Sequence, residues 1–332
     1  MSGNGNGNRR SKKLTLLLTS AGRRVALLQA FRRGAAQLGI ELEVLACDLR
    51  PELSAACQVA DGHFAVPCVE DPGYVDALLA IVRERGVDLI VPTIDPELLP
   101  LARAREAFAA LGADVAVSAP ELVEIARDKL ATARFLEANQ IQTPRTAPLA
   151  ELREGSSGWH WPLIVKPRHG SASRSILTVV DPSELPEHEE EPMIAQELLR
   201  GTEWTVNLYF DRGGNLVTSV PHERLQIRAG EVEKGVTHRS SWLSTIAGKM
   251  AAALPGPRGV LCFQAMVAPG GATSVFEINA RFGGGYPLAD KAGATFARWL
   301  LEECADLPSS AADEWAEGVT MLRYDAAVFV VP

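Results

Sequence analysis

The chain has 332 residues, of which 47% are hydrophobic and 22% are charged, and its formal net charge is −8. This length and composition predict a soluble globular protein with two or three lobes. The negative charge argues against a broad electrostatic surface for nucleic acid. The five cysteines are scattered without a Cys-x-x-Cys pair, which predicts reduced thiols rather than a disulfide framework or a zinc site.

The first 12 residues are rich in Gly, Asn and basic side chains, and they predict a disordered basic tail. The apolar run that follows, residues 14–18, is too short for a signal-peptide core. No stretch of the sequence approaches the length of a transmembrane helix. We therefore expect a cytoplasmic protein that has no membrane partner.

Residues 13–118 alternate between short apolar strands and helices with apolar residues at helical spacing. The expected strands are 14–18, 43–48, 88–93 and 113–117, and the expected helices are 25–38, 72–86 and one that starts at 94–97. This order predicts a Rossmann-like parallel α/β lobe whose strand ends face a crevice. Gly22 stands alone in the first turn, where an NAD(P) fingerprint needs three spaced glycines. We prefer a small anionic group resting on Ser20, Gly22 and Arg23.

Residues 119–199 contain a lysine that ends an apolar strand. The expected elements are helices 120–130 and 131–139 and strands 161–168, 175–180 and 193–199, with a solvated helix or loop at 181–192. Lys166 precedes Pro167, and a Ser- and Gly-rich loop follows at 169–175. Such a loop exposes N–H groups and hydroxyls to phosphate oxygens, although it lacks the Gly-Lys-Ser/Thr of a Walker A loop.

Residues 200–332 read mainly as antiparallel hairpins. The expected strands are 204–210, 217–221, 224–228, 260–268 and a closing strand near 322–331, with one helix at 287–304. This alternating pattern, broken by Gly-rich turns, differs from the parallel pattern of the first lobe.

The strand 275–279 combines an acid and an amide with the spacing of a metal site. Glu277 and Asn279 alternate with Phe276 and Ile278, so a strand would send both oxygen-bearing side chains to one face. Hard oxygen donors suit Mg²⁺, which commonly shares them with substrate phosphates. Arg281 stands one alternation further on and is placed to neutralise a transferring phosphoryl group.

Taken in order, these motifs resemble the ATP-grasp superfamily, closest in type to single-copy relatives of the carbamoyl-phosphate synthase large subunit. The motifs that carry the resemblance are 19–24, Asp128-Lys129, 165–167, 196–199, 201–203 and 277–281. The resemblance implies a combined α/β and α+β fold. A Rossmann-like pre-ATP-grasp domain (13–118) would precede an ATP-grasp fold with an N-terminal subdomain (119–199) and a C-terminal subdomain (200–332).

The resemblance also implies roles for individual residues. Lys129 and Lys166 would hold the ATP phosphates under the loop of Ser171, Ala172 and Ser173. The connector Gln196, Glu197, Leu198 and Leu199 would grip adenine, and Glu203 would bind the ribose hydroxyls. Gln264, Glu277 and Asn279 would bind Mg²⁺, with Mn²⁺ as a substitute. Arg281 would touch the transferred phosphate, Arg228 would reach the same region, and the glycine turn 283–285 would admit substrate.

ATP-grasp enzymes typically phosphorylate a carboxylate, which an amine then attacks. We therefore expect an ATP- and Mg²⁺-dependent ligase of a small-molecule carboxylate and an amine, with a homodimer as an ordinary assembly. The residues fit, because phosphoryl transfer needs positioning and charge neutralisation more than a protein nucleophile. Two alternatives stay open: an ATP-grasp kinase or carboxylase, and a non-catalytic nucleotide-binding sensor. The sequence does not identify the substrates.

Overall fold

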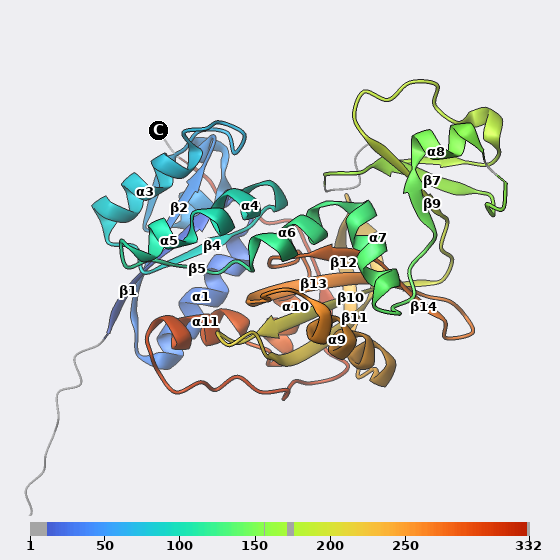
Figure 1. Ribbon diagram of the computed structural model, residues 1–332. Helices are drawn as coiled ribbons and strands as arrows, with labels where there is room; N and C mark the ends of the chain where they lie inside the picture. The colour runs from blue at the N-terminus through green and yellow to red at the C-terminus, as the bar shows by residue number, and fades with distance from the viewer. Residues whose placement is uncertain (1–11, 156, 171–175, 331–332) are drawn as a thin grey trace, which may run out of the picture.

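The computed structural model describes residues 12–155, 157–170 and 176–330. In these residues the strands form three sheets (Figure 1): five strands in the first, four in a small second sheet, and six in the third. Within the same ranges, none of the helices combines the length and apolar character that crossing a bilayer requires.

The first sheet is parallel and has the order β3-β2-β1-β4-β5. Its core strand β1 is buried along nearly its whole length, as the apolar run in the sequence predicts. The elements of this part are β1 (Lys13–Thr19), α1 (Val25–Leu38), β2 (Glu41–Asp48), the 3₁₀ turn Pro51–Leu53, α2 (Ala55–Val59), β3 (Gly62–Ala65), α3 (Tyr74–Arg85), β4 (Leu89–Pro92), α4 (Asp95–Arg103), α5 (Arg105–Ala109) and β5 (Asp114–Val115).

The second sheet is antiparallel, has the order β6-β9-β7-β8 and stands apart from the rest of the molecule at the upper right of Figure 1. It has its own small hydrophobic core. Helices α6 (Pro120–Arg127) and α7 (Lys129–Ala138) lead into it. Its elements are β6 (Thr146–Pro148), α8 (Leu149–Glu154), β7 (Leu163–Pro167), β8 (Leu177–Val179), the 3₁₀ turn Pro182–Glu184 and β9 (Met193–Glu197).

The third sheet is antiparallel, with the order β14-β13-β10-β11-β12-β15. Its elements are β10 (Thr202–Phe210), β11 (Leu216–Arg228), β12 (Glu231–Thr237), α9 (Ser241–Ala253), β13 (Gly259–Val267), β14 (Thr273–Asn279), α10 (Tyr286–Ala292), α11 (Phe296–Cys304) and β15 (Thr320–Leu322). The mixed parallel and antiparallel architecture confirms the expected fold class.

The first and third parts pack closely against each other. A Cβ at Gly34 of α1 would lie 2.9 Å from the Cα of Arg298 in α11, so these two helices meet almost backbone to backbone. Ala119 N–H also donates to Gly256 O at 2.9 Å. This packing holds the carboxyl ends of the parallel strands against the third sheet, where the cavity described below lies.

Several elements of the last part differ from the sequence expectation. Strands 217–221 and 224–228 are one continuous strand, β11. The helix expected over 287–304 is divided into α10 and α11, because Gly293 adopts a φ of 111° and ends the first of them. The closing strand is only β15. Helix α9 was not expected, although Ser240 caps it by accepting a hydrogen bond from Leu243 N–H.

Candidate active site

One cavity of about 920 Å³ lies where the three sheets meet. Eleven of the predicted site residues line it: Lys129, Lys166, Gln196, Glu197, Leu198, Leu199, Glu203, Gln264, Glu277, Asn279 and Arg281. Residues of the first part, at 20–24 and 93–95, line the same cavity. The predicted phosphate-loop residues Ser171, Ala172 and Ser173 lie outside the described residues.

Lys166 is a buried cation at the end of β7. Its Nζ donates to Gln196 Oε1 at 2.8 Å and lies 5.9 Å from the centre of the Phe276 ring. Burial lowers the pKa of Lys166 to about 8, and the nearby Glu277 opposes this shift. An ammonium group in such a place gains most from an anionic ligand, because it has left water without acquiring a full counter-charge.

Lys129 approaches the same space from the first turn of α7. Asp128 caps this helix by accepting hydrogen bonds from the N–H groups of Leu130 and Ala131, which fixes the helix start and hence the lysine. Lys129 Nζ donates to Gly170 O at 2.7 Å, at the edge of the loop between β7 and β8. Burial lowers the pKa of Lys129, and Glu277 and Asp95 oppose the shift.

Gln264 and Glu277 are direct cross-strand partners on β13 and β14, and with Asn279 they present amide and carboxylate oxygens to the cavity. Within the described residues, no three His, Cys, Asp or Glu side chains gather as a metal site. The donor set here is one carboxylate and two amides, which fits a hard cation that shares its ligands with phosphate oxygens.

The strand alternation expected around Glu277 is broken at one residue. Ile278 is buried in the core, as expected, but Phe276 lines the cavity beside Glu277. The β13–β14 pairing shifts register between Gln264 and Ala265. Such a bulge places two residues of one strand opposite one of the other, and it turns a side chain to the other face.

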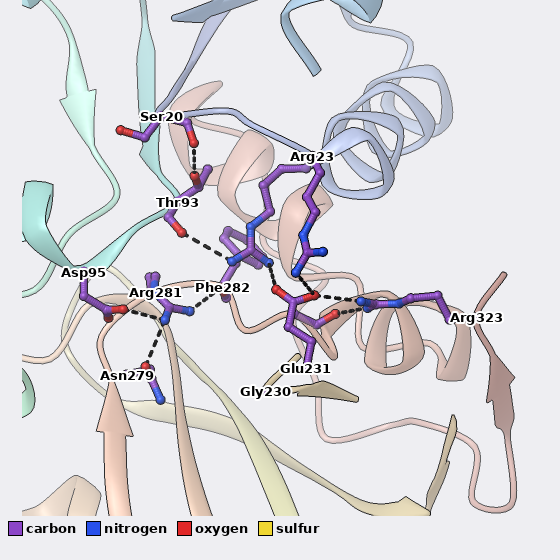
Figure 2. A network of polar contacts seen from close by, with 12 residues as sticks. Ser20, Arg23, Thr93, Asp95, Gly230, Glu231, Asn279, Arg281, Phe282 and Arg323 are labelled. Carbon is purple, nitrogen blue, oxygen red and sulfur yellow. Dashed lines mark hydrogen bonds and ion pairs between the residues drawn. The ribbon is translucent and has the colours of Figure 1, made fainter. Parts of the chain in front are cut away.

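Arg281 is almost completely buried and contacts the first part of the chain. Its Nη2 donates to Asp95 Oδ2 at 2.6 Å and to Asn279 Oδ1 at 3.0 Å, as Figure 2 shows. Burial disfavours its charge, but the ion pair with Asp95 outweighs this and raises the pKa of Arg281. The sequence explained Asp95 mainly as a helix-start residue. It does begin α4, and it also connects two lobes at the cavity.

The structure places Arg224, rather than Arg228, at the cavity. Arg228 forms ion pairs with Glu233 and Asp325 at the surface and does not line the cavity. Arg224 does line it, pairs with Glu203 and donates to Gly230 O at 2.7 Å. The expectation that Arg228 reaches the region of the transferred phosphate is therefore not met, and Arg224 is the arginine of β11 at the cavity. The β11–β12 pairing shifts register twice between Arg224 and Ile227. Because of these shifts, strand alternation does not predict on which face the Arg228 side chain lies from the position of Arg224.

A buried glutamate organises the loops of the first part. Glu97 accepts hydrogen bonds from Ser20 Oγ at 2.8 Å, Tyr74 OH at 2.6 Å and Thr93 N–H at 2.7 Å. Burial raises the pKa of Glu97, and these hydrogen bonds oppose the shift. Gly22 N–H donates to Asp48 Oδ2 at 2.8 Å. Two groups of the expected anion site, Ser20 and Gly22, are thus engaged, and the third, Arg23, forms a 3.4 Å ion pair with Glu231 Oε2 at the cavity.

Two functional candidates lay outside the sequence predictions: Glu231 and Arg323. Figure 2 shows Arg23 and Arg323 converging on the carboxylate of Glu231, next to the Arg281–Asp95 pair. Arg24 Nη1 also lies 3.9 Å from this carboxylate. Arg24 belongs to a turn that the sequence singled out. No local signal indicates Glu231 or Arg323, because their partners are remote in the chain.

Comparison with known families places two matches along the chain. Residues 16–116 match the PylC-like N-terminal domain, and residues 126–285 match the ATP-grasp domain. No curated protein sequence matches the chain.

Solved structures with the same fold include several enzymes. N5-carboxyaminoimidazole ribonucleotide synthetase from Thermotoga maritima has a TM-score of 0.66 and 18% identity, covering 91% of this chain and 78% of that one. L-amino acid ligase from Bacillus licheniformis has a TM-score of 0.67 and 20% identity, and the match covers 91% of this chain and 76% of that one.

The biotin carboxylase domain of Hydrogenobacter thermophilus 2-oxoglutarate carboxylase, solved with MgADP and bicarbonate, has a TM-score of 0.72 and 14% identity. The match covers 91% of this chain and 72% of that domain. At such identities these likenesses show a shared fold.

Proposed function

We propose that the chain, of which residues 126–285 match the ATP-grasp domain and residues 16–116 the PylC-like N-terminal domain, is an ATP- and Mg²⁺-dependent, ADP-forming ligase. It activates a small-molecule carboxylate for attack by an amine. The observation that carries the proposal is the meeting of two lysines, the buried Lys166 and the half-buried Lys129, with the Gln264–Glu277–Asn279 face in one cavity. Phosphate-binding cations and oxygen ligands for a divalent metal are the two requirements of phosphoryl transfer.

In the proposed reaction, Lys129 and Lys166 bind the triphosphate, and the segment Gln196 to Leu199 binds adenine beside them. Gln264, Glu277 and Asn279 would hold Mg²⁺, and the metal would supply neutralisation of the phosphate charge. An oxygen of the substrate carboxylate attacks the γ-phosphorus, and the bond to the β–γ bridging oxygen breaks to release ADP. The amine then attacks the acyl carbon and expels phosphate, and the amine loses a proton.

Arg281 supplies charge neutralisation on the first lobe's side of this reaction. Its guanidinium lies between Asn279 and Asp95, so the group is held in place before any ligand arrives. A donor fixed in advance stabilises developing charge without reorganisation. The first lobe reaches the reacting groups through Asp95 and the adjacent loops, and this is where the carboxylate and the amine would be selected.

Incubation of the purified protein with ATP, Mg²⁺ and a panel of amino acids tests the proposal. We expect ADP and phosphate in equal amounts, and a coupled product in which phosphate is not retained. Release of ADP with a stable phosphorylated product would support a kinase instead. Absence of nucleotide binding by calorimetry would overturn the proposal, and ADP release would exclude a non-catalytic sensor.

A carboxylase is the second candidate, because the similar biotin carboxylase domain was solved in complex with MgADP and bicarbonate. In that reaction bicarbonate is the carboxylate that is phosphorylated. ADP release that depends on bicarbonate, with labelled bicarbonate incorporated into the product, would favour it. Incorporation of the amino acid carboxylate into an amide would favour the ligase.

A further inference from the structure

The carboxylate of Glu231 is shared by three arginines from two separate segments of the chain. Arg323 Nη1 donates to Glu231 Oε2 at 2.7 Å. Arg23 Nη2 lies 3.4 Å from the same oxygen, and Arg24 Nη1 lies 3.9 Å from Oε1. The three arginines come from the turn before α1 and from the segment after β15. Chain connectivity does not require this convergence, so tertiary packing alone produces the cluster.

The cluster has more positive than negative charge. Three guanidinium groups face one carboxylate, and the neighbouring Arg281 is already balanced by Asp95. Among the described residues, Asp48 forms no ion pair with these arginines. Helix α1 begins directly after Arg24, and the first turn of this helix contains no acidic residue. The partial positive charge of the helix end therefore adds to that of the arginines.

The contacts of Arg23 and Arg24 with Glu231 are looser than a hydrogen bond, so both retain donors for another anion. The Arg23 side chain is 72% exposed and that of Glu231 is 26% exposed. Arg24 Nη2 also makes a long contact of 3.4 Å with Thr93 O, whereas Arg323 is held by two short hydrogen bonds, to Glu231 Oε2 and Gly284 O. The cluster thus combines fixed and adjustable cations at the wall of the cavity.

Glu231 lies beside the glycine turn 283–285, where a substrate would approach. A Cβ at Gly284 would lie 2.8 Å from Glu231 Cδ, and Arg323 Nη2 donates to Gly284 O at 2.6 Å. Glu231 directly follows the turn of Ala229 and Gly230, which have φ values of 49° and 76°. A short hairpin turn is an element that can shift without disturbing the sheet core.

We infer that Arg23, Arg24 and Arg323 bind a second anionic group of the substrate, a carboxylate or a phosphate that does not react, and that Glu231 occupies their site until the substrate replaces it. The inference rests on the proposed function, in which Arg281 and the Gln264–Glu277–Asn279 face stabilise the group that reacts. Arg23, Arg24 and Glu231 line the same cavity as the Gln264–Glu277–Asn279 face. The substrate is therefore an acid with two anionic groups, rather than a simple monocarboxylate.

Calorimetric titration of the full chain tests this inference, with succinate and inorganic phosphate as the two probes and succinamide as the uncharged counterpart of succinate. The protein is first saturated with Mg²⁺ and a non-hydrolysable ATP analogue, so that phosphate cannot occupy the nucleotide site. The variants are Glu231→Gln and Arg23→Gln. Arg50→Gln is the matched control, because Arg50 is an exposed arginine that pairs with one acid, Glu52, outside the cavity.

Loss of the internal competitor should tighten probe binding to Glu231→Gln roughly tenfold, and loss of one cation should weaken binding to Arg23→Gln by a similar factor. Arg50→Gln should bind as the parent does, and succinamide should not bind. A preference for succinate or for phosphate identifies the group.

Weaker or unchanged binding to Glu231→Gln would overturn the inference, as would equal binding of succinamide. The thermal midpoint of each variant shows whether it is folded. If Glu231→Gln does not fold, Arg23→Gln provides the test, because the Arg23 side chain is largely exposed and its replacement should not disturb the fold. Each succinate titration is repeated without the analogue. Succinate binding without analogue binding would refute the proposed function and keep the anion site, and the reverse result would refute only the anion site.

Discussion

Burial of Lys166 predicts that nucleotide binding takes up a proton at alkaline pH. The pKa of this lysine is about 8 in the ligand-free protein, compared with 10.5 for an exposed lysine, a difference that corresponds to about 3 kcal/mol. This is the free energy by which burial disfavours the ammonium form. Triphosphate oxygens beside Nζ would supply the missing counter-charge and raise the pKa again.

The direction of the pH dependence follows from the protonation states. Below pH 8 the free protein already carries the proton, and nucleotide affinity does not depend on this group. Above pH 8 the lysine is neutral when free and charged when bound, so affinity falls about tenfold per pH unit. At pH 9, Lys166 should contribute about one proton per nucleotide bound, and Lys129, whose pKa burial also lowers, should add to the uptake.

Calorimetry at pH 9 in two buffers with different ionisation enthalpies measures the proton uptake directly. Lys166→Met should bind nucleotide more weakly and take up about one proton less than the parent. Lys249→Met, which removes an exposed lysine of α9, should match the parent. Equal proton uptake by the parent and Lys166→Met would refute the reasoning, as would an affinity that is constant between pH 7.5 and 9.5, about the range in which Lys166 titrates.

Three further predictions concern the metal face, the backbone and acid stability. Glu277→Gln removes the one carboxylate of the metal set, and we expect ADP release to fall roughly 100-fold or more; a loss below about tenfold would contradict the assignment. Gly201→Ala should lower the free energy of unfolding by about 3 kcal/mol or more in urea, because its Cβ would lie 2.1 Å from Val267 O and its φ is 148°; Gly270→Ala, which meets nothing within 4 Å, is the control. Burial lowers the pKa of His222 from 6.5 to about 3, so stability is complete above pH 6.5 and falls by about 1.4 kcal/mol per unit as pH decreases toward 3. His222→Gln should reduce that slope in denaturation measured at pH 7 and pH 5.

Local patterns in the sequence were sufficient to locate several elements and the chemistry that neighbouring residues share. The apolar runs and helical spacing located β1, α1 and β2 within a few residues, because those patterns depend only on how a strand or helix divides buried from exposed faces. Alternation likewise placed Glu277 and Asn279 on one face. Lys166, at the end of its strand, also lines the cavity as expected.

The contacts that those groups make with remote segments depend on tertiary packing. The register shift that turns Phe276 into the cavity, and the two shifts that separate Arg224 from Arg228, depend on partner strands rather than on the local pattern. The pairing of Arg281 with Asp95, and the convergence of Arg23, Arg24 and Arg323 on Glu231, join segments that are remote in the chain. Periodicity fixes the direction of a side chain relative to its own strand or helix. It contains no information on which distant element packs opposite, and substrate recognition in this cavity depends on that packing.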